Sequence, residues 1–211
     1  MSLAQVQARM RAAQEAAGRS NEPVELVVVS KGRPLGAIQE LYKAGHRDFG
    51  ENRAQELAAK APELPGDIRW HFIGPLQRNK VALVRPLVAK LHSLDRLPLA
   101  DAWVRGKTDA PPALLEINLG DEPQKHGFRP GEAAAACDAI VAKGVDVRGV
   151  MSIPPLGETA TPYFERLVEL RDELAQRHPR VVEVSAGMTD DFEEAIRAGA
   201  TTIRVGRAIF D

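Results

Sequence analysis

The chain is poor in cysteine and carries no excess of charge of either sign. Its one cysteine, Cys137, excludes a disulfide within the chain, and its helical spacing with Ile140 and Val141 predicts a small buried hydrophobe. The 28 lysines and arginines balance 29 aspartates and glutamates, which leaves a net charge of -1 and no electrostatic footprint for nucleic acid or an anionic membrane. We therefore expect neither nucleic acid nor a membrane as a partner.

Long apolar runs are also missing. No run approaches the length of a membrane span, and the opening MSLAQVQARMRAAQEAAG interrupts its apolar residues with Arg and Gln, unlike the apolar core of a secretion signal. Neither the cysteine nor the five histidines are spaced like metal ligands. These absences predict a cytoplasmic protein without a disulfide and without a metal site.

Short runs rich in Val, Ile and Leu alternate along the chain with segments of helical spacing. Strict alternation of strand and helix implies right-handed crossovers and a parallel sheet, and eight such units close a (β/α)8 barrel. The predicted fold is therefore a TIM barrel, with an open doubly wound sheet as the alternative because two of the strands are short. The predicted strands span residues 24–30, 48–50, 69–73, 90–93, 114–118, 147–152, 181–185 and 202–205.

The barrel is expected to take up the whole chain, residues 1–211, as a single domain. Only GRAIFD follows the eighth strand, and this segment is too short for a full covering helix. We expect an additional N-terminal helix, roughly residues 3 to 17, to cover the flank that this leaves open.

A lysine follows the first strand, in the stretch LVVVSKGRP. In a TIM barrel the active face lies at the carboxyl ends of the strands, so Lys31 is a candidate site residue. One interpretation is a rim lysine with its ammonium in water. The other is an amine whose pKa is lowered by burial near Val27 and Val29, which makes it a nucleophile toward an aldehyde.

Glycine-containing turns follow the seventh and eighth strands, where such barrels bind phosphate. Gly187 and Gly206 permit close approach of backbone N–H groups to an anion, and Arg207 adds a positive charge. Asp190 and Asp191 must face outward for an anion to bind there. A Schiff-base lysine opposite a phosphate site suits pyridoxal 5'-phosphate (PLP), while a cofactor-free Schiff-base aldolase acting on a phosphorylated sugar is an alternative.

Seven stretches occur in an order that resembles one known family: VVVSKGRP, AGHRDFGENRAQE, IRWHFIGPLQRNK, HSLDR, DEPQKHGF, RGVMSIP and SAGMTDDFEEAIRAGATTIRVGRAIF. They are similar to the YggS/PROSC family of PLP homeostasis proteins. The resemblance implies an alanine racemase-like barrel that is usually monomeric and holds PLP without established catalytic turnover.

The resemblance also implies roles for individual residues. Lys31 matches the lysine that forms the Schiff base with PLP, and Arg204 matches the arginine that faces the pyridine nitrogen. Asn52 and His71 match the rim and wall of the pocket. The loops around the phosphate are matched by Ser185, Gly187, Met188, Thr189, Gly206 and Arg207.

Four positions depart from the family pattern. Thr189 stands where Ser is usual and keeps the hydroxyl, and Ala186 replaces a frequent Met. Gly32 is smaller than the common residue after the lysine. Arg207 replaces a usual Thr or Ser, so any contact of that hydroxyl with phosphate passes here to the backbone N–H or to the guanidinium.

An arginine beside the pyridine nitrogen cannot accept its proton, so the ring stays neutral and is a poor electron sink. The two tyrosines, Tyr42 and Tyr163, fall in predicted helices, where neither suits the second acid/base of a racemase. The sequence therefore favours a monomeric protein that buffers PLP and delivers it to apo-enzymes rather than an enzyme. A weak PLP-dependent racemase or lyase is the alternative, and Lys80 and Lys125 are either surface lysines or part of a second PLP site.

Overall fold

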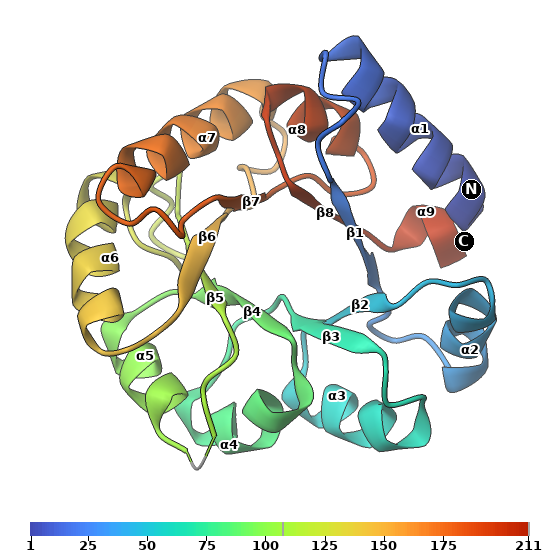
Figure 1. Cartoon of the computed structure of the whole chain (residues 1–211), viewed down its shortest axis with the longest axis horizontal. Coiled ribbons are helices and arrows are strands. Elements are labelled where there is room, and N and C mark those ends of the chain that lie inside the picture. The colour runs from blue at the N-terminus through green and yellow to red at the C-terminus, as the bar shows by residue number, and fades with distance from the viewer. Residues whose placement is uncertain (107, 211) are drawn as a thin grey trace.

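The computed structural model describes residues 1–106 and 108–210, in which eight parallel strands close into one barrel in chain order (Figure 1). Closure is made by β1 and β8, which pair in parallel with Leu26 opposite Ile203 and Val28 opposite Val205. The predicted TIM barrel is confirmed, and the alternative of an open sheet is wrong. The strands are β1 (Glu25–Val29), β2 (Asp48–Glu51), β3 (Arg69–Phe72), β4 (Lys90–Leu94), β5 (Ala113–Glu116), β6 (Val147–Met151), β7 (Glu183–Ser185) and β8 (Thr202–Val205).

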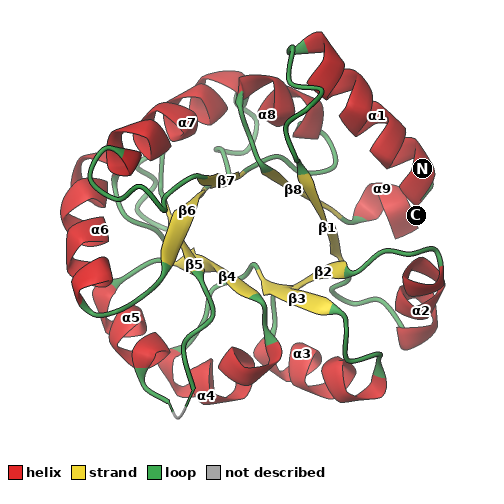
Figure 2. Ribbon diagram, viewed as in Figure 1, coloured by secondary structure: helices red, strands yellow, loops and turns green. Residues whose placement is uncertain are grey.

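Helices form a ring around the strands (Figure 2). Gly45, Gly144 and Gly199 follow helices with φ of +93°, +89° and +121°, a conformation that glycine adopts without strain. Among the described residues the α-helices are α1 (Leu3–Ala16), α2 (Leu35–Lys43), α3 (Ala54–Lys60), α4 (Val81–Val84), α5 (Leu97–Val104), α6 (Ala133–Ala142), α7 (Thr161–Ala175), α8 (Phe192–Ala198) and α9 (Arg207–Phe210). Short 3-10 helices are η1 (Ala61–Glu63), η2 (Arg78–Lys80), η3 (Arg85–Leu87) and η4 (Pro130–Glu132).

The N-terminal helix covers the flank that the short α9 leaves open, as the sequence predicted. It begins with a capping box, in which Ser2 and Gln5 each accept a hydrogen bond from the other's backbone N–H group. On its inner side Arg9 pairs with Glu193 at 2.5 Å and lies over the ring of Phe192. Helix α1 therefore packs beside α8 and α9 (Figure 1).

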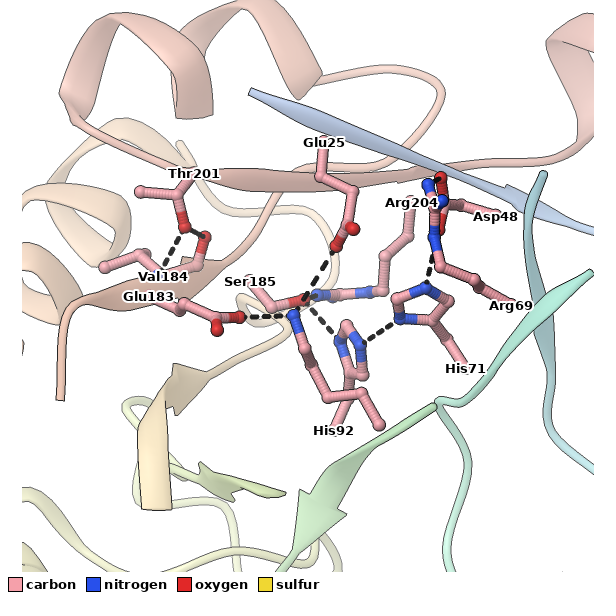
Figure 3. A network of polar contacts seen from close by, with 11 residues as sticks. Glu25, Asp48, Arg69, His71, His92, Glu183, Val184, Ser185, Thr201 and Arg204 are labelled. Atoms are coloured by element: carbon pink, nitrogen blue, oxygen red, sulfur yellow. Dashed lines mark hydrogen bonds and ion pairs between the residues drawn. The ribbon is translucent and has the colours of Figure 1, made fainter. Parts of the chain in front are cut away.

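Two different environments follow from the alternation of side chains along the strands. Outward-facing residues such as Ile203 and Val205 join the apolar layer between strands and helices, where Cys137 is also fully buried, as expected. The barrel interior is polar instead, because His71, His92 and Arg204 point into it (Figure 3). Within the described residues, no helix is both long and apolar enough to cross a bilayer.

Candidate functional site

Lys31 lies in a tight turn at the carboxyl end of β1. The turn runs from Ser30 to Arg33, is closed by the Arg33 N–H donating to the Ser30 carbonyl at 3.0 Å, and has Gly32 at a φ of +71°. A positive φ at the third position is typical of a type II turn and favours glycine there. Lys31 is exposed, so its side chain is not buried near Val27 and Val29, as the second interpretation of the sequence required.

A cavity of about 270 Å³ adjoins Lys31, and its other lining residues are Gly32, Asn52, Arg53 and Glu56. The side-chain oxygen of Asn52 is buried here and has no hydrogen-bond partner within the described chain. A buried oxygen without a partner is costly unless a ligand or water satisfies it. Asn52 and Lys31 thus line one cavity, and Asn52 offers an unused acceptor to a ligand.

Arg204 lies inside the barrel on β8, beside Val27 of β1 in the strand register. Its guanidinium donates to the Ser185 hydroxyl at 2.6 Å and to the Ser152 carbonyl at 3.1 Å. Burial lowers the pKa of Arg204 to about 10, so the side chain remains a cation at neutral pH. The two hydrogen bonds fix the guanidinium plane and use two of its five N–H donors.

A chain of hydrogen bonds runs from Arg204 down the barrel interior (Figure 3). The Ser185 hydroxyl contacts Nδ1 of His92 at 2.9 Å, and Nε2 of His92 contacts Nδ1 of His71 at 2.9 Å. His71 Nε2 in turn reaches the carboxylate of Asp48 at 3.2 Å, which also pairs with Arg69. Arg204 is therefore linked through Ser185, His92 and His71 to the carboxylate of Asp48, the first residue of β2.

The pKa values of His92 and Asp48, two members of this series of hydrogen bonds, follow from burial and from these contacts. Burial, followed by the charges of His71, Arg204 and Lys90, holds the pKa of His92 well below its usual range. Burial would raise the pKa of Asp48, but hydrogen bonds from His71 and Arg69 outweigh it and lower that pKa to about 2. The chain therefore joins a neutral His92 to a carboxylate and a guanidinium at neutral pH.

These contacts revise two sequence predictions. Both ring nitrogens of His71 are bonded to protein groups, so none is left to donate to or accept from a ligand, and only a contact of its ring face with the pocket stays a prediction. The Ser185 hydroxyl is likewise engaged by Arg204 and His92, which makes it a support for Arg204, while its place near a phosphate stays a prediction. The sequence could not predict either pairing, because each joins residues of different strands.

The loops after β7 and β8 lie where the sequence placed the phosphate site. Gly187 has a φ of +86°, and a Cβ there would come within 2.6 Å of Ala195, so only glycine fits. A Cβ at Gly206 would lie 2.9 Å from the Val29 carbonyl oxygen, next to β1. Met188 is 38% exposed and its N–H donates to Asp191 at 2.6 Å, which leaves that amide unavailable to an anion in this conformation.

Arg207 and Asp190 form an ion pair at 2.6 Å on the outer surface. The two side chains are 73% and 78% exposed, so Asp190 faces outward, as an anion site in these loops requires. Asp191 does not meet this expectation, because it is half-buried and its carboxylate accepts the Met188 N–H within the loop. The guanidinium of Arg207 is held by Asp190 rather than by the loop backbone. A contact of Arg207 with a ligand phosphate therefore stays a prediction.

Glu116, the last residue of β5, was missed by the sequence analysis. One of its carboxylate oxygens is buried and has no hydrogen-bond partner in the described part of the chain. Burial and the nearby charge of Asp95 raise the pKa of Glu116 to about 7, against the opposing effect of Arg204 and Arg96. The available signal was its place two residues after Leu114, at the carboxyl end of a barrel strand.

At the amino ends of the strands, Glu25, Asp48 and His71 bring potential metal-ligand atoms within 4.8 Å of one another. Side-chain cations already occupy this region, because Lys90 lies 3.6 Å from Glu25 and Arg69 pairs with Asp48. We therefore assign no metal site to this group.

The two tyrosines lie on helices, as the sequence predicted. The hydroxyl of Tyr42, on α2, donates to Asp67 at 2.7 Å, and that of Tyr163, on α7, donates to Glu158. Both hydroxyl groups thus contact acidic side chains outside the barrel interior.

Two further lysines have different surroundings. Lys80 is half-buried at the end of η2. Lys125 is not a freely solvated side chain, because its ammonium donates to the Pro154 carbonyl at 3.2 Å and pairs with Glu122. Lys125 therefore ties the loop after β5 to the loop after β6.

A lysine after the first strand and a buried arginine on the eighth, in one closed barrel, match a known class of domain. The whole chain, residues 1–211, matches the family model described as alanine racemase, N-terminal domain, and belongs to that family. Within it, the chain belongs to the pyridoxal phosphate homeostasis proteins. It is 39% identical to the protein of that name from Pseudomonas aeruginosa, over 99% of this chain and 93% of the relative. The family resemblance seen in the sequence is confirmed.

Solved structures agree with this membership. PipY of Synechococcus elongatus without PLP is 38% identical, with a TM-score of 0.84 over 95% of this chain and 99% of PipY. A second PipY structure, with PLP bound, is 37% identical, with a TM-score of 0.80 over the same shares of the two chains. Alanine racemase of Corynebacterium glutamicum, 16% identical with a TM-score of 0.66 over 99% of this chain and 61% of the racemase, shows the shared fold alone.

Proposed function

We propose that this chain is a PLP-binding protein that holds PLP as a Schiff base on Lys31 and serves PLP homeostasis in the cytoplasm as a single-domain monomer. The observation that carries the proposal is the pairing of an accessible lysine with a buried, oriented arginine. Lys31 lies in the turn after β1, and Arg204 of β8 lies beside Val27 of β1. PLP supplies an aldehyde for the first and a pyridine nitrogen for the second.

The remaining contacts are assigned from the same geometry. The unpartnered oxygen of Asn52 accepts a hydrogen bond from the ligand at the rim. The loops at Gly187, Thr189 and Gly206 bind the phosphate through backbone N–H groups. Both glycines are required by close packing, of Gly187 against Phe192 and Ala195 and of Gly206 against Val29. The names of the Pseudomonas aeruginosa relative and of PLP-bound PipY support PLP as the ligand.

Arg204 favours storage over catalysis. A guanidinium donates to the pyridine nitrogen and cannot give up a proton to it, so the bound ring stays neutral and withdraws electrons weakly. We therefore assign the protein to buffering of PLP and its delivery to apo-enzymes, without catalytic turnover.

Binding is tested by titrating the protein and its Lys31→Ala variant with PLP and recording visible absorption. The proposal expects a Schiff-base band in the wild type only, with residual, phosphate-dependent PLP binding in the variant. A wild type without the band would refute the assignment of Lys31 and favour the aldolase alternative.

Delivery needs a separate experiment. The PLP-loaded protein is mixed with an apo PLP-dependent enzyme in the presence of a phosphatase that destroys free PLP. Direct delivery predicts that the enzyme is still activated, whereas loss of activation would limit the role to buffering.

Exchange of the Cα proton of amino acids with solvent deuterium, dependent on Lys31, would establish the racemase or lyase alternative instead.

A further inference from the structure

Three charged residues lie directly under the Lys31 turn. Glu51 ends β2, and Glu56 and Lys60 belong to α3. Glu51 is fully buried, Lys60 is 7% exposed, and Glu56 is half-buried at the edge of the cavity beside Lys31. Buried charges of this kind are costly unless they are paired and hydrogen-bonded, so their placement calls for a physical reason.

The ammonium of Lys60 makes three hydrogen bonds. It donates to the Ser30 carbonyl at 2.8 Å, to Glu51 Oε1 at 2.7 Å and to Glu56 Oε1 at 2.6 Å. An ammonium group has three protons, so every donor of Lys60 is used. One of the three acceptors is the carbonyl of the peptide group that leads into Lys31.

Glu56 holds the next peptide group. Its Oε1 accepts the backbone N–H of Gly32 at 2.5 Å, in addition to the ammonium of Lys60. Burial would raise the pKa of Glu56, but the hydrogen bonds from Lys60 and Gly32 outweigh burial and lower it, so the side chain is a carboxylate at neutral pH. Lys60 and Glu56 thus bind the peptide groups on both sides of Lys31.

Fixing both flanking peptide planes fixes the two backbone dihedrals of Lys31 and with them the direction of its Cα–Cβ bond. The Ser30 side strengthens this restraint, since its N–H donates to the Gly50 carbonyl at 2.9 Å and its hydroxyl to Glu51 Oε1 at 2.7 Å. A lysine side chain is long and flexible, so a fixed backbone at Lys31 reduces the conformational entropy that is lost when its amine reacts with an aldehyde.

We propose that Glu56 and Lys60 are positioning residues for Lys31, which hold its backbone so that its amine reacts with the PLP aldehyde. This inference rests on the proposed function. Glu56 and Lys60 touch the backbone of the turn, and they act on the ligand only through Lys31.

The test uses Glu56→Ala in the full-length protein, because Glu56 is half-buried and its truncation leaves Lys60 paired with Glu51. Glu63→Ala in η1 is the matched control, an exposed carboxylate in the next turn of the chain. Loss of a hydrogen bond to a charged group predicts Schiff-base formation with PLP about tenfold slower in Glu56→Ala. Glu56→Gln keeps the acceptor oxygen and is expected to retain most of the wild-type rate.

A double-mutant cycle separates positioning from general damage to the pocket. In a Lys31→Ala background, Glu56→Ala should change the residual PLP affinity by less than about twofold, because the residue that Glu56 positions is gone. An equal loss of PLP affinity on Glu56→Ala in the wild-type and Lys31→Ala backgrounds would overturn the inference. So would unchanged kinetics of Glu56→Ala in a protein that does form the Schiff base.

Amide hydrogen exchange in the protein without PLP tests the contact independently of the ligand. The Gly32 amide should exchange about tenfold faster in Glu56→Ala than in Glu63→Ala, because it has lost its acceptor. Equal exchange of the Gly32 amide in the two variants would contradict the hydrogen bond between Gly32 and Glu56. A wild type that forms no adduct on Lys31 would refute the proposed function, and the positioning role with it, even if the exchange result held.

Discussion

His71 and His92 share a hydrogen bond of 2.9 Å inside the barrel, from Nε2 of His92 to Nδ1 of His71 when both rings are neutral. The direction then follows from the Asp48 end, because a carboxylate only accepts and His71 must donate to it from Nε2. With both rings neutral, each imidazole carries its proton on Nε2, and Ser185 donates to His92 Nδ1. Arg204 is held by a chain with one polarity.

The direction of these hydrogen bonds predicts which nitrogen of His92 carries the proton between about pH 5 and pH 8, a range in which an unperturbed histidine titrates. Burial and the neighbouring charges lower the pKa of His92, so its ring should stay neutral throughout. Nitrogen-15 chemical shifts of the imidazole should show a protonated Nε2 and an unprotonated Nδ1. A His92 ring that titrates in this range, or one protonated on Nδ1, would contradict the direction of the chain.

Asp48 is expected to make the fold sensitive to acid. Its pKa is lowered to about 2 in the folded protein, so its stabilising effect is present above the unfolded value near 4 and is lost as the pH falls toward 2. Asp48→Asn should therefore lower the free energy of unfolding by about 2 kcal/mol at neutral pH and much less near pH 2. Urea denaturation measures this. Asp172→Asn, an exposed ion-pair partner, is the control and should have little effect.

Glu116 should have the opposite pH dependence. Its pKa is raised to about 7, so the folded protein binds a proton that the unfolded chain releases near pH 4.5, and stability falls as the pH rises through that window. Glu116→Gln should raise the free energy of unfolding by roughly 3 kcal/mol above pH 7 and leave it nearly unchanged near pH 4. Denaturation across this range, with Glu40→Gln on α2 as an exposed control, checks the difference. A variant that is less stable at every pH would show that Glu116 is ionised and paired.

Arg204→Gln tests the assigned partner of the pyridine nitrogen. Gln keeps a polar side chain but loses the charge and the fixed donor geometry, so PLP affinity should fall by about tenfold or more and the absorption maximum of the bound ligand should shift. The far-ultraviolet circular dichroism should remain that of the wild type, because the barrel strands do not depend on this side chain. An unchanged spectrum of bound PLP would place the pyridine nitrogen elsewhere.

The barrel could be predicted because its signals are local. Several strands read as short apolar runs, and glycine ends several helices, so alternating strand and helix units can be counted from the sequence. Where the observed strand ends differ from the predicted ones, they differ by one or two residues, since an apolar residue such as Val24 can precede the first hydrogen bond of the sheet.

The candidate site could be predicted only at residues that follow the end of a barrel strand. Lys31, Gly187 and Gly206 each follow a barrel strand, and that position alone identifies them. The pairing of His71 with His92 depends on which residues of separate strands face each other, and spacing within one strand does not specify this. Lys60 gave no signal either, because a lysine at the end of a helix is usually solvated, whereas here it is buried under the Lys31 turn.

The most direct test of the account is borohydride reduction of the PLP-loaded protein followed by peptide mapping. Reduction converts a Schiff base into a stable secondary amine, so the labelled peptide identifies the lysine. We expect the label on Lys31 in the wild type and no stoichiometric label in Lys31→Ala. A label on Lys80 or Lys125, or a wild type that takes up none, would contradict the central claim that Lys31 holds the cofactor.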